Sequence, residues 1–270
     1  MLAAHRAAFA VRLALSSPVH LIARLAARRD PKAPLQGRSK QVAAALHAMT
    51  SQPVPLQRPV VVLAGYRAWP LMAETLRGQL IRATSGDPRD VLAVSYTNMG
   101  FTDQILAHAR REISRWRPDV ASGDTELDVV GISMGGIVGR ALAAAEFGDP
   151  ALRIRRIFSL ATPHRGAKIA ERFAPDPAAK DLRPGSDLLA RLDALLPRAA
   201  FELVPYAVVN DTWVGATRTA PPKMHPIWTP GARVISHFTV SETPGIIADI
   251  ARRLRSEPPL AATPSPPPRD

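Results

Sequence analysis

The sequence predicts an α/β fold with a doubly wound, mostly parallel sheet. From residue 59 onward, short apolar runs alternate with segments of helical periodicity, which is typical of parallel strands joined by crossover helices. The chain has 270 residues, 46% of them hydrophobic, so it is long enough to bury a sizeable core as one large domain. Sheets of this kind place their sites at the carboxyl ends of the strands, so candidate residues are sought there.

Six short apolar runs are expected to form the sheet. They span residues 59–65, 91–96, 127–133, 154–162, 202–210 and 232–236. Helices are expected over 70–83, 102–116 and 135–146, between successive runs. The last helix begins near Pro244 and has one apolar face, which is made by Ile246, Ile247, Ile250, Ala251 and Leu254.

The two ends of the chain differ in composition from the part that forms the sheet. Residues 1–54 are expected to form a basic helical extension, 55–255 the α/β domain, and 256–270 a Pro-rich disordered tail outside the fold. Residues 167–200 exceed an ordinary connection in length and carry leucines at helical spacing, namely Leu188, Leu189, Leu192, Leu195 and Leu196. This segment forms either a small helical cap over the strand ends or a crossover helix whose leucines face the sheet.

The positive charge of the chain is concentrated near its N-terminus. The formal net charge is +12, and residues 1–40 carry eight basic residues against one acidic residue. Three interpretations of residues 1–29 are open: a helical extension packed on the domain, a helix on a membrane surface, and a cleaved targeting segment. The second would bring residues 1–40 into contact with an anionic membrane.

Composition also limits the possible partners and cofactors. No apolar run reaches the roughly 18 residues of a membrane-spanning helix, and we expect a cytoplasmic protein, peripheral to a membrane under the second interpretation. Aromatic residues make up only 5% of the chain and are not interleaved with basic ones, so nucleic-acid binding is not expected. The absence of cysteine excludes disulfides, cysteine-ligated zinc and thiol nucleophiles. No metal or other cofactor is expected, and the oligomeric state is not indicated.

A G-x-S-x-G motif follows the third expected strand directly and opens the next helix. It reads Gly131-Ile132-Ser133-Met134-Gly135. A serine hydroxyl becomes a useful nucleophile when a sharp turn exposes it, and glycines two residues away on each side relieve the crowding of such a turn. A bare motif can arise by chance, but its position between a strand and a helix favours Ser133 as a nucleophile.

The base and acid that a serine nucleophile needs are expected after later strands, the acid first and the histidine second. Asp211 follows the run 202–210, and His237 follows the run 232–236 just before the last helix. In this arrangement the histidine takes the proton of Ser133 and the carboxylate holds the imidazolium. A simple turn aspartate is the alternative interpretation of Asp211.

Other titratable residues fit these positions less well. His225 precedes the last expected strand and is the strongest rival for the base, whereas His164 follows a strand but precedes the acid, which fits a structural or pocket role better. Three further aspartates lie in a segment without a preceding strand, namely Asp181, Asp187 and Asp193.

Two backbone N–H groups are expected to stabilise a developing oxyanion. One belongs to Met134, directly after the nucleophile, where the helix N-terminus adds a favourable dipole. The second is the N–H of Tyr66, in the loop after the first strand, where Gly65 lets the chain turn closely beneath the site. A glycine that simply ends the strand is the alternative interpretation of Gly65.

At this point the sequence resembles the α/β-hydrolase superfamily and, within it, the bacterial lipases and related lipid esterases. The resemblance covers about residues 55–255 and rests on "VVVLAGY", "GISMGG", "SLATPHRGAKIA", "LRPGSDLLARL", Asp211 in "NDTWVG" and His237 before the final helix. The sequence departs from the pattern at one place. Such lipases usually carry His-Gly in the loop after the first strand, where this chain has Ala64-Gly65.

These features predict a serine hydrolase that cleaves carboxylic esters with an apolar acyl part, through Ser133, His237 and Asp211 and an acyl-enzyme. The expected partner is a small-molecule or lipid ester. The same site would also suit a thioesterase, an amidase or an acyltransferase, because these reactions share one oxyanion intermediate. A third interpretation, of another class, is a non-catalytic protein of this fold that binds a membrane surface through its basic N-terminal segment.

Overall fold

The structure, a computed structural model, describes most of the chain. The described residues are 30–36, 39–68, 70–148, 151–231, 236–261 and 263–268. The interpretations of residues 1–29, and most of the strand expected at 232–236, therefore lie outside the described residues.

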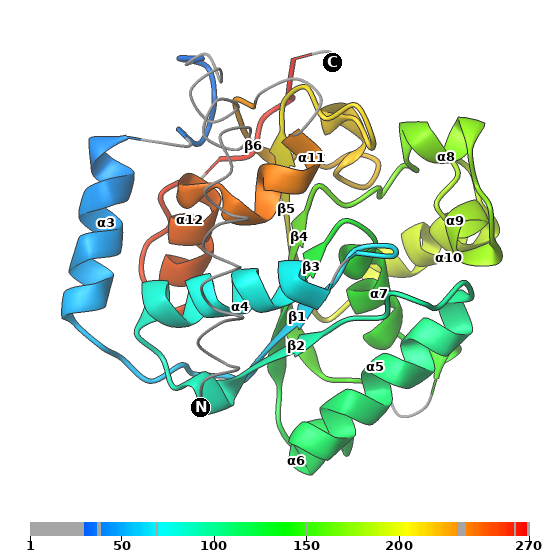
Figure 1. Cartoon of the computed structure of the whole chain (residues 1–270), viewed down its shortest axis with the longest axis horizontal. Coiled ribbons are helices and arrows are strands. Elements are labelled where there is room, and N and C mark those ends of the chain that lie inside the picture. The colour runs from blue at the N-terminus through cyan, green and yellow to red at the C-terminus, as the bar shows by residue number, and fades with distance from the viewer. Residues whose placement is uncertain are drawn as a thin grey trace, which may run out of the picture.

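A six-stranded sheet forms the centre of the protein (Figure 1). Neighbouring strands are parallel throughout, and their order is β2-β1-β3-β4-β5-β6. The strands are β1 Val60–Leu63, β2 Val91–Val94, β3 Leu127–Ile132, β4 Ile154–Leu160, β5 Glu202–Val208 and β6 Ile227–Thr229. The central strands β1 and β3 are buried along their whole length, which explains why their apolar runs are continuous rather than alternating.

Helices cover both faces of this sheet. On one face, α4 (Pro70–Thr84) contacts α3 (Lys40–Ser51) and α12 (Pro244–Leu254), and on the other, α5 (Thr102–Trp116) contacts α7 (Met134–Leu142) (Figure 1). The shorter helices are α6 Pro118–Ala121, α8 Lys168–Arg172, α9 Pro177–Asp181, α10 Asp187–Leu195 and α11 Ser236–Thr239. Single turns of 3₁₀-helix are η1 Pro88–Asp90, η2 Ala145–Phe147, η3 Leu196–Arg198, η4 Ala216–Arg218 and η5 Val240–Glu242.

The structure confirms the predicted doubly wound α/β fold, and the first five expected strands lie within a few residues of their predicted ends. The sixth strand differs from the expectation. The observed β6 is only three residues long, so it is too short to appear as an apolar run in the sequence. It lies between Pro226 and Pro230, whose lack of a backbone N–H also argues against a strand at this place. Ser236 begins α11 instead of ending a strand.

Residues 167–200 do not behave as one unit. The leucines of α10 that are fully buried, namely Leu188, Leu189 and Leu192, belong to the main hydrophobic core. In addition, Asp193 of α10 pairs with the buried Arg140 of α7 at 2.9 Å. Helix α10 is therefore packed on the domain as a crossover helix would be, and the covering of the strand ends comes from α8 and α9.

The C-terminal segment is packed against the domain, contrary to the expected disordered tail. The carboxylate of Asp249 in α12 is fully buried, and its Oδ1 accepts hydrogen bonds from the N–H groups of Leu260 at 2.6 Å and Ala261 at 2.9 Å. The proline-rich composition did not indicate this, because the acceptor lies in another element. Within the described residues, no helix is both long enough and apolar enough to cross a membrane.

Both ends of the described chain meet at β6. The N–H of Leu35 donates to the C=O of Trp228 at 3.3 Å. In the C-terminal segment, the Ser265 hydroxyl accepts from the indole Nε1 of Trp228 at 2.9 Å, and the N–H of Ser265 donates to the C=O of Pro226 at 3.4 Å. The outer edge of the sheet is thus covered by residues that precede and follow the α/β domain.

Replacing Asp249 with alanine is expected to destabilise the protein strongly. Besides the two backbone N–H groups, Asp249 accepts from the Tyr206 hydroxyl at 2.6 Å and from Arg253 at 2.9 Å. Its removal leaves the buried Tyr206 hydroxyl and the N–H of Ala261 without this acceptor and takes one partner from Arg253. We therefore expect the free energy of unfolding to fall by about 3–5 kcal/mol, measured by urea denaturation. In Asp103→Ala, at the exposed start of α5, the change should stay below about 1 kcal/mol. Equal losses in the two variants would contradict this account.

Candidate active site

Ser133 lies in a sharp turn between β3 and α7. Its φ of +51° is in the region that residues other than glycine seldom adopt, so the backbone of the turn is strained, and the residue is half-buried. The turn is fixed because the N–H of Ser133 donates to the C=O of Leu160 in the neighbouring strand at 2.7 Å. This geometry presents the hydroxyl at the carboxyl end of the sheet.

The two glycines of the motif permit close backbone contacts around this turn. A Cβ on Gly131 would lie 2.3 Å from the N of Gly136, and a Cβ on Gly135 would lie 2.3 Å from the carbonyl oxygen of Leu63 in β1. No side chain fits at either distance. Both glycines are therefore required by space, as the motif predicted.

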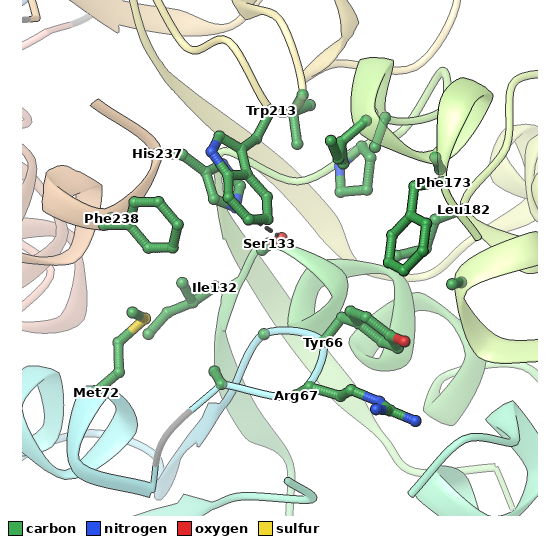
Figure 2. A pocket seen from close by; sticks show the side chains of 18 of the residues that line it. Tyr66, Arg67, Met72, Ile132, Ser133, Phe173, Leu182, Trp213, His237 and Phe238 are labelled. Atoms are coloured by element: carbon green, nitrogen blue, oxygen red, sulfur yellow. Dashed lines mark hydrogen bonds between the residues drawn. The ribbon is translucent and has the colours of Figure 1, made fainter. Parts of the chain in front are cut away.

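Ser133, His237 and Asp211 form a continuous chain of hydrogen bonds, and Figure 2 shows its Ser133 and His237 members. The Nε2 atom of His237 lies 3.1 Å from the Oγ of Ser133, and its Nδ1 atom lies 2.9 Å from the Oδ2 of Asp211. Because an ionised carboxylate can only accept, Nδ1–H donates to Asp211, and in the neutral form of the ring Nε2 can then accept from the serine hydroxyl. This is the tautomer that a general base needs.

Asp211 is fully buried, three residues after the end of β5, and its two oxygens have different partners. Oδ1 accepts from the N–H groups of Trp213 and Val214, each at 2.9 Å, while Oδ2 faces His237. Burial alone raises the pKa of Asp211, but the hydrogen bond and charge of His237 and the two backbone donors bring this pKa below its ordinary value. The residue is thus both a turn aspartate and the partner of the histidine.

Two aromatic side chains surround His237. The Trp213 ring is stacked on the imidazole, with centroids 6.0 Å apart and planes within 9° of parallel, and Phe238 meets both rings edge-on. Sequence reasoning did not single out either residue, although each lies within two positions of a candidate site residue. Their packing restricts the orientation of the imidazole and shields it from solvent.

The loop after β1 passes directly beside the nucleophile. A Cβ on Gly65 would lie 3.2 Å from the Cβ of Ser133, and the loop is closed by the N–H of Ala68, which donates to the C=O of Gly65 at 3.2 Å. The N–H groups of Tyr66 in this loop and of Met134 at the start of α7 find no protein acceptor among the described residues. Both are available for an oxygen atom of a ligand.

The rival residues lie elsewhere. His225 is exposed and away from Ser133, and Asp181 accepts from the Thr102 hydroxyl at 2.6 Å. His164 is fully buried, with Nε2 2.9 Å from the Ser159 hydroxyl and Nδ1 3.1 Å from Arg140. Burial and the nearby charge of Arg140 hold the pKa of His164 well below its ordinary value, which keeps the ring neutral. His164 is therefore a structural residue.

An apolar cavity of about 490 Å³ opens beside Ser133 (Figure 2). One wall comes from residues 167–182, which include α8 and α9, and the opposite wall includes Met72 and Ile132. Four large hydrophobic side chains that line the cavity are also exposed to solvent at its mouth: Ile169, Phe173, Trp213 and Phe238. Among the described residues, no group of three or more histidines, aspartates and glutamates is placed to hold a metal ion.

Comparison with known proteins identifies the fold. No family model and no curated protein matches the sequence. A lipase from Bacillus licheniformis, BlEst2 in its mature form, aligns with 76% of this chain and 95% of its own, at 15% identity and a TM-score of 0.56. The product of the gene lin2722 from Listeria innocua aligns with 75% of this chain and 95% of its own, at 14% identity and a TM-score of 0.53. The fold is that of the α/β-hydrolases.

A third solved structure matches a smaller part of the chain. The chain also aligns with the phospholipase PlaB from Legionella pneumophila over 57% of its own length, at 13% identity and a TM-score of 0.47. This alignment spans only 38% of PlaB. In this fold, Ser133 directly follows β3 and Asp211 lies three residues after β5. His237 lies in α11, and the strand expected directly before it falls on residues outside the described part of the chain.

The elbow glycines offer a matched pair of substitutions. In Gly135→Ala the new methyl group overlaps the backbone of β1, so we expect the free energy of unfolding to fall by about 3 kcal/mol or more. In Gly78→Ala, within α4, the methyl group meets only the end of the Arg82 side chain at 3.4 Å, and the variant should gain about 0.5–1 kcal/mol. Thermal and urea unfolding of both variants measures the difference. A stable Gly135→Ala protein would contradict the packing described for the turn.

Proposed function

We propose that this protein is a serine hydrolase that cleaves carboxylic esters with an apolar acyl part. The observation that carries the proposal is the hydrogen-bonded chain from Asp211 through His237 to Ser133, which ends at an apolar cavity. The α/β-hydrolase fold supports it, because nucleophile, acid and base follow its usual chain order. The lipase BlEst2 has the same fold.

In the proposed reaction, the Oγ of Ser133 attacks the ester carbonyl carbon while Nε2 of His237 takes the hydroxyl proton. The oxyanion forms beside the N–H groups of Met134 and Tyr66, and Asp211 stabilises the imidazolium. The carbon–oxygen bond then breaks, the alcohol leaves with the proton from His237, and the acyl group stays on Ser133. A water molecule gives a proton to His237 and attacks the acyl carbon, which releases the carboxylic acid and restores the serine.

The cavity supports an apolar acyl group as the recognised part of the substrate. Its walls are largely hydrocarbon, so each buried methylene group contributes about 0.8 kcal/mol of binding free energy. The exposed hydrophobic residues at the mouth extend this apolar surface outward. They therefore favour lipid esters over freely soluble polar esters.

Labelling by a fluorophosphonate probe tests the nucleophile. We expect the wild-type protein to be labelled and Ser133→Ala to remain unlabelled, because the probe reacts only with an activated hydroxyl. Turnover of p-nitrophenyl esters should fall by about 10⁴-fold or more in Ser133→Ala. Labelling that survives this substitution would remove Ser133 from its proposed role. A panel of ester, thioester and amide leaving groups then separates esterase from thioesterase and amidase activity.

Narrowing the cavity tests the acyl site. Ala170 is buried in the cavity wall, and Ala170→Phe should lower kcat/KM for octanoate esters while acetate esters are hydrolysed nearly as before. Each methylene that no longer fits costs about 0.8 kcal/mol, or roughly fourfold in kcat/KM. The control is Ala190→Phe on the exposed side of α10, for which we expect an unchanged chain-length profile. Parallel losses for short and long esters in Ala170→Phe would contradict this assignment of the cavity.

A further inference from the structure

The carboxylate of Asp176, at the start of α9, connects this helix to the loop beside the nucleophile. Asp176 lies directly before α9, and its Oδ1 accepts from the N–H of Ala179 at 2.9 Å, which caps that helix. Its Oδ2 accepts from the hydroxyl of Tyr66 at 2.7 Å and lies 2.7 Å from a guanidinium nitrogen of Arg67. One side chain therefore holds two successive residues of the loop after β1.

The remaining contacts fix the two ends of this loop. The hydroxyl of Tyr96 donates to the C=O of Ala64, and the hydroxyl of Thr97 donates to the C=O of Ala68 at 2.9 Å. Tyr66 and Arg67 lie between these anchors, and it is their side chains that reach Asp176. The N–H of Tyr66, the second oxyanion donor in the proposed reaction, thus belongs to the part of the loop that Asp176 holds.

The backbone of this part of the loop is strained. Arg67 has a φ of +48°, which costs a residue other than glycine about 1–2 kcal/mol. The ion pair with Asp176 offsets part of this cost, and the guanidinium also lies over the Tyr66 ring, 5.6 Å from its centroid. Loss of the carboxylate would therefore remove one of the contacts that hold the turn in this conformation.

Asp176 itself stands on a rigid base. The N–H of Ala178 donates to the C=O of Gly100 at 2.8 Å, and the Thr102 hydroxyl at the start of α5 donates to Asp181 at 2.6 Å. These bonds attach both ends of α9 to the chain next to α5. The position of the Asp176 carboxylate is therefore set by the attachment of α9 to the chain around the start of α5.

The two partners have suitable protonation states near neutral pH. Burial and the hydrogen bond to Asp176 raise the pKa of Tyr66 to about 12, so the phenol keeps its proton. Burial alone raises the pKa of Asp176, but the Tyr66 hydroxyl, the N–H of Ala179 and the Arg67 guanidinium bring this pKa below its ordinary value. The tyrosine is a donor and the aspartate a charged acceptor.

We infer that Asp176 is a positioning residue for ester hydrolysis, which acts by holding Tyr66 and Arg67 so that the N–H of Tyr66 points at the oxyanion formed on Ser133. The inference rests on the proposed function. The loop after β1 carries Ala64-Gly65 in place of His-Gly. According to this inference, the loop is ordered by Asp176, which lies 110 positions after Tyr66 in the chain. Donors to the oxyanion matter most in the transition state, so their misplacement lowers kcat and leaves KM nearly unchanged.

Two substitutions test the inference by separate routes. Asp176→Asn keeps the size of the side chain and an oxygen that can cap α9, but it removes the charge that holds Arg67 and one of the two acceptor oxygens. Tyr66→Phe removes only the hydroxyl and leaves the helix cap intact. For p-nitrophenyl esters we expect each variant to lower kcat by about 10- to 100-fold, with KM within about twofold of the wild type.

A second readout separates positioning from a merely structural role. Trifluoromethyl ketones form a tetrahedral adduct with the serine and so report the oxyanion donors directly. Their affinity should fall by the same factor as kcat in both variants. The double variant should lose little more than the worse single variant, because both substitutions break the same contact. The matched control is Asp187→Asn, at the exposed first turn of α10, whose kcat and inhibitor affinity should equal those of the wild type.

The outcomes are distinguishable. If Asp176→Asn and Tyr66→Phe keep the wild-type kcat and inhibitor affinity, even with a lower melting temperature, the inference is overturned while the proposed function stands. A rise in KM alone would also overturn it, since it would assign Asp176 to substrate binding. If the wild-type protein neither reacts with a fluorophosphonate nor hydrolyses any ester, the proposed function fails and the inference falls with it.

Discussion

The site depends on the direct backbone contact between the first turn of α7 and the end of β1. Gly135 lies so close to the carbonyl of Leu63 that no side chain fits between them. This contact brings the helix that follows the nucleophile and the loop that follows β1 to the same point. Ser133, the N–H of Met134 and the loop at Gly65 are neighbours because these backbones touch. The geometry of the site is therefore a property of the packed sheet and helix rather than of flexible side chains.

A buried polar network fixes the same helix at its far side. Arg140 of α7 contacts both His164, in the loop after β4, and Asp193 of α10, and His164 in turn contacts Ser159. Four residues from three elements and a loop thus share one set of hydrogen bonds. A buried cation is costly unless it is paired, so this network specifies how α7, α10 and the loop after β4 pack together. The histidine of the "TPHRG" sequence thus contributes to the site indirectly, by fixing the frame around it.

The sequence predicted those features that depend on short stretches of chain. The apolar runs that form β1 to β5 and the motif around Ser133 are local patterns, and the position of Asp211 follows from the order of elements in a parallel sheet. His237 was selected by its position just before the last helix and after an expected strand that falls mostly outside the described residues. Contacts between distant segments left no such pattern. Asp176 contacts Tyr66 across 110 positions, and the packing of Leu260 depends on a single buried aspartate. Strand β6 is too short, and too closely flanked by prolines, to be visible as an apolar run.

The covered edge of β6 has a consequence for the association of copies of this protein. An open strand edge presents unpaired N–H and C=O groups, which invite a strand from another molecule and lead to aggregation. Here the carbonyls of Trp228 and Pro226 are already occupied by Leu35 and Ser265, which lie on opposite sides of the domain in the sequence. The two flanking segments thus cover the edge strand of the sheet. Shortening the chain from either end toward the α/β domain would remove part of this cover and expose an unpaired strand edge.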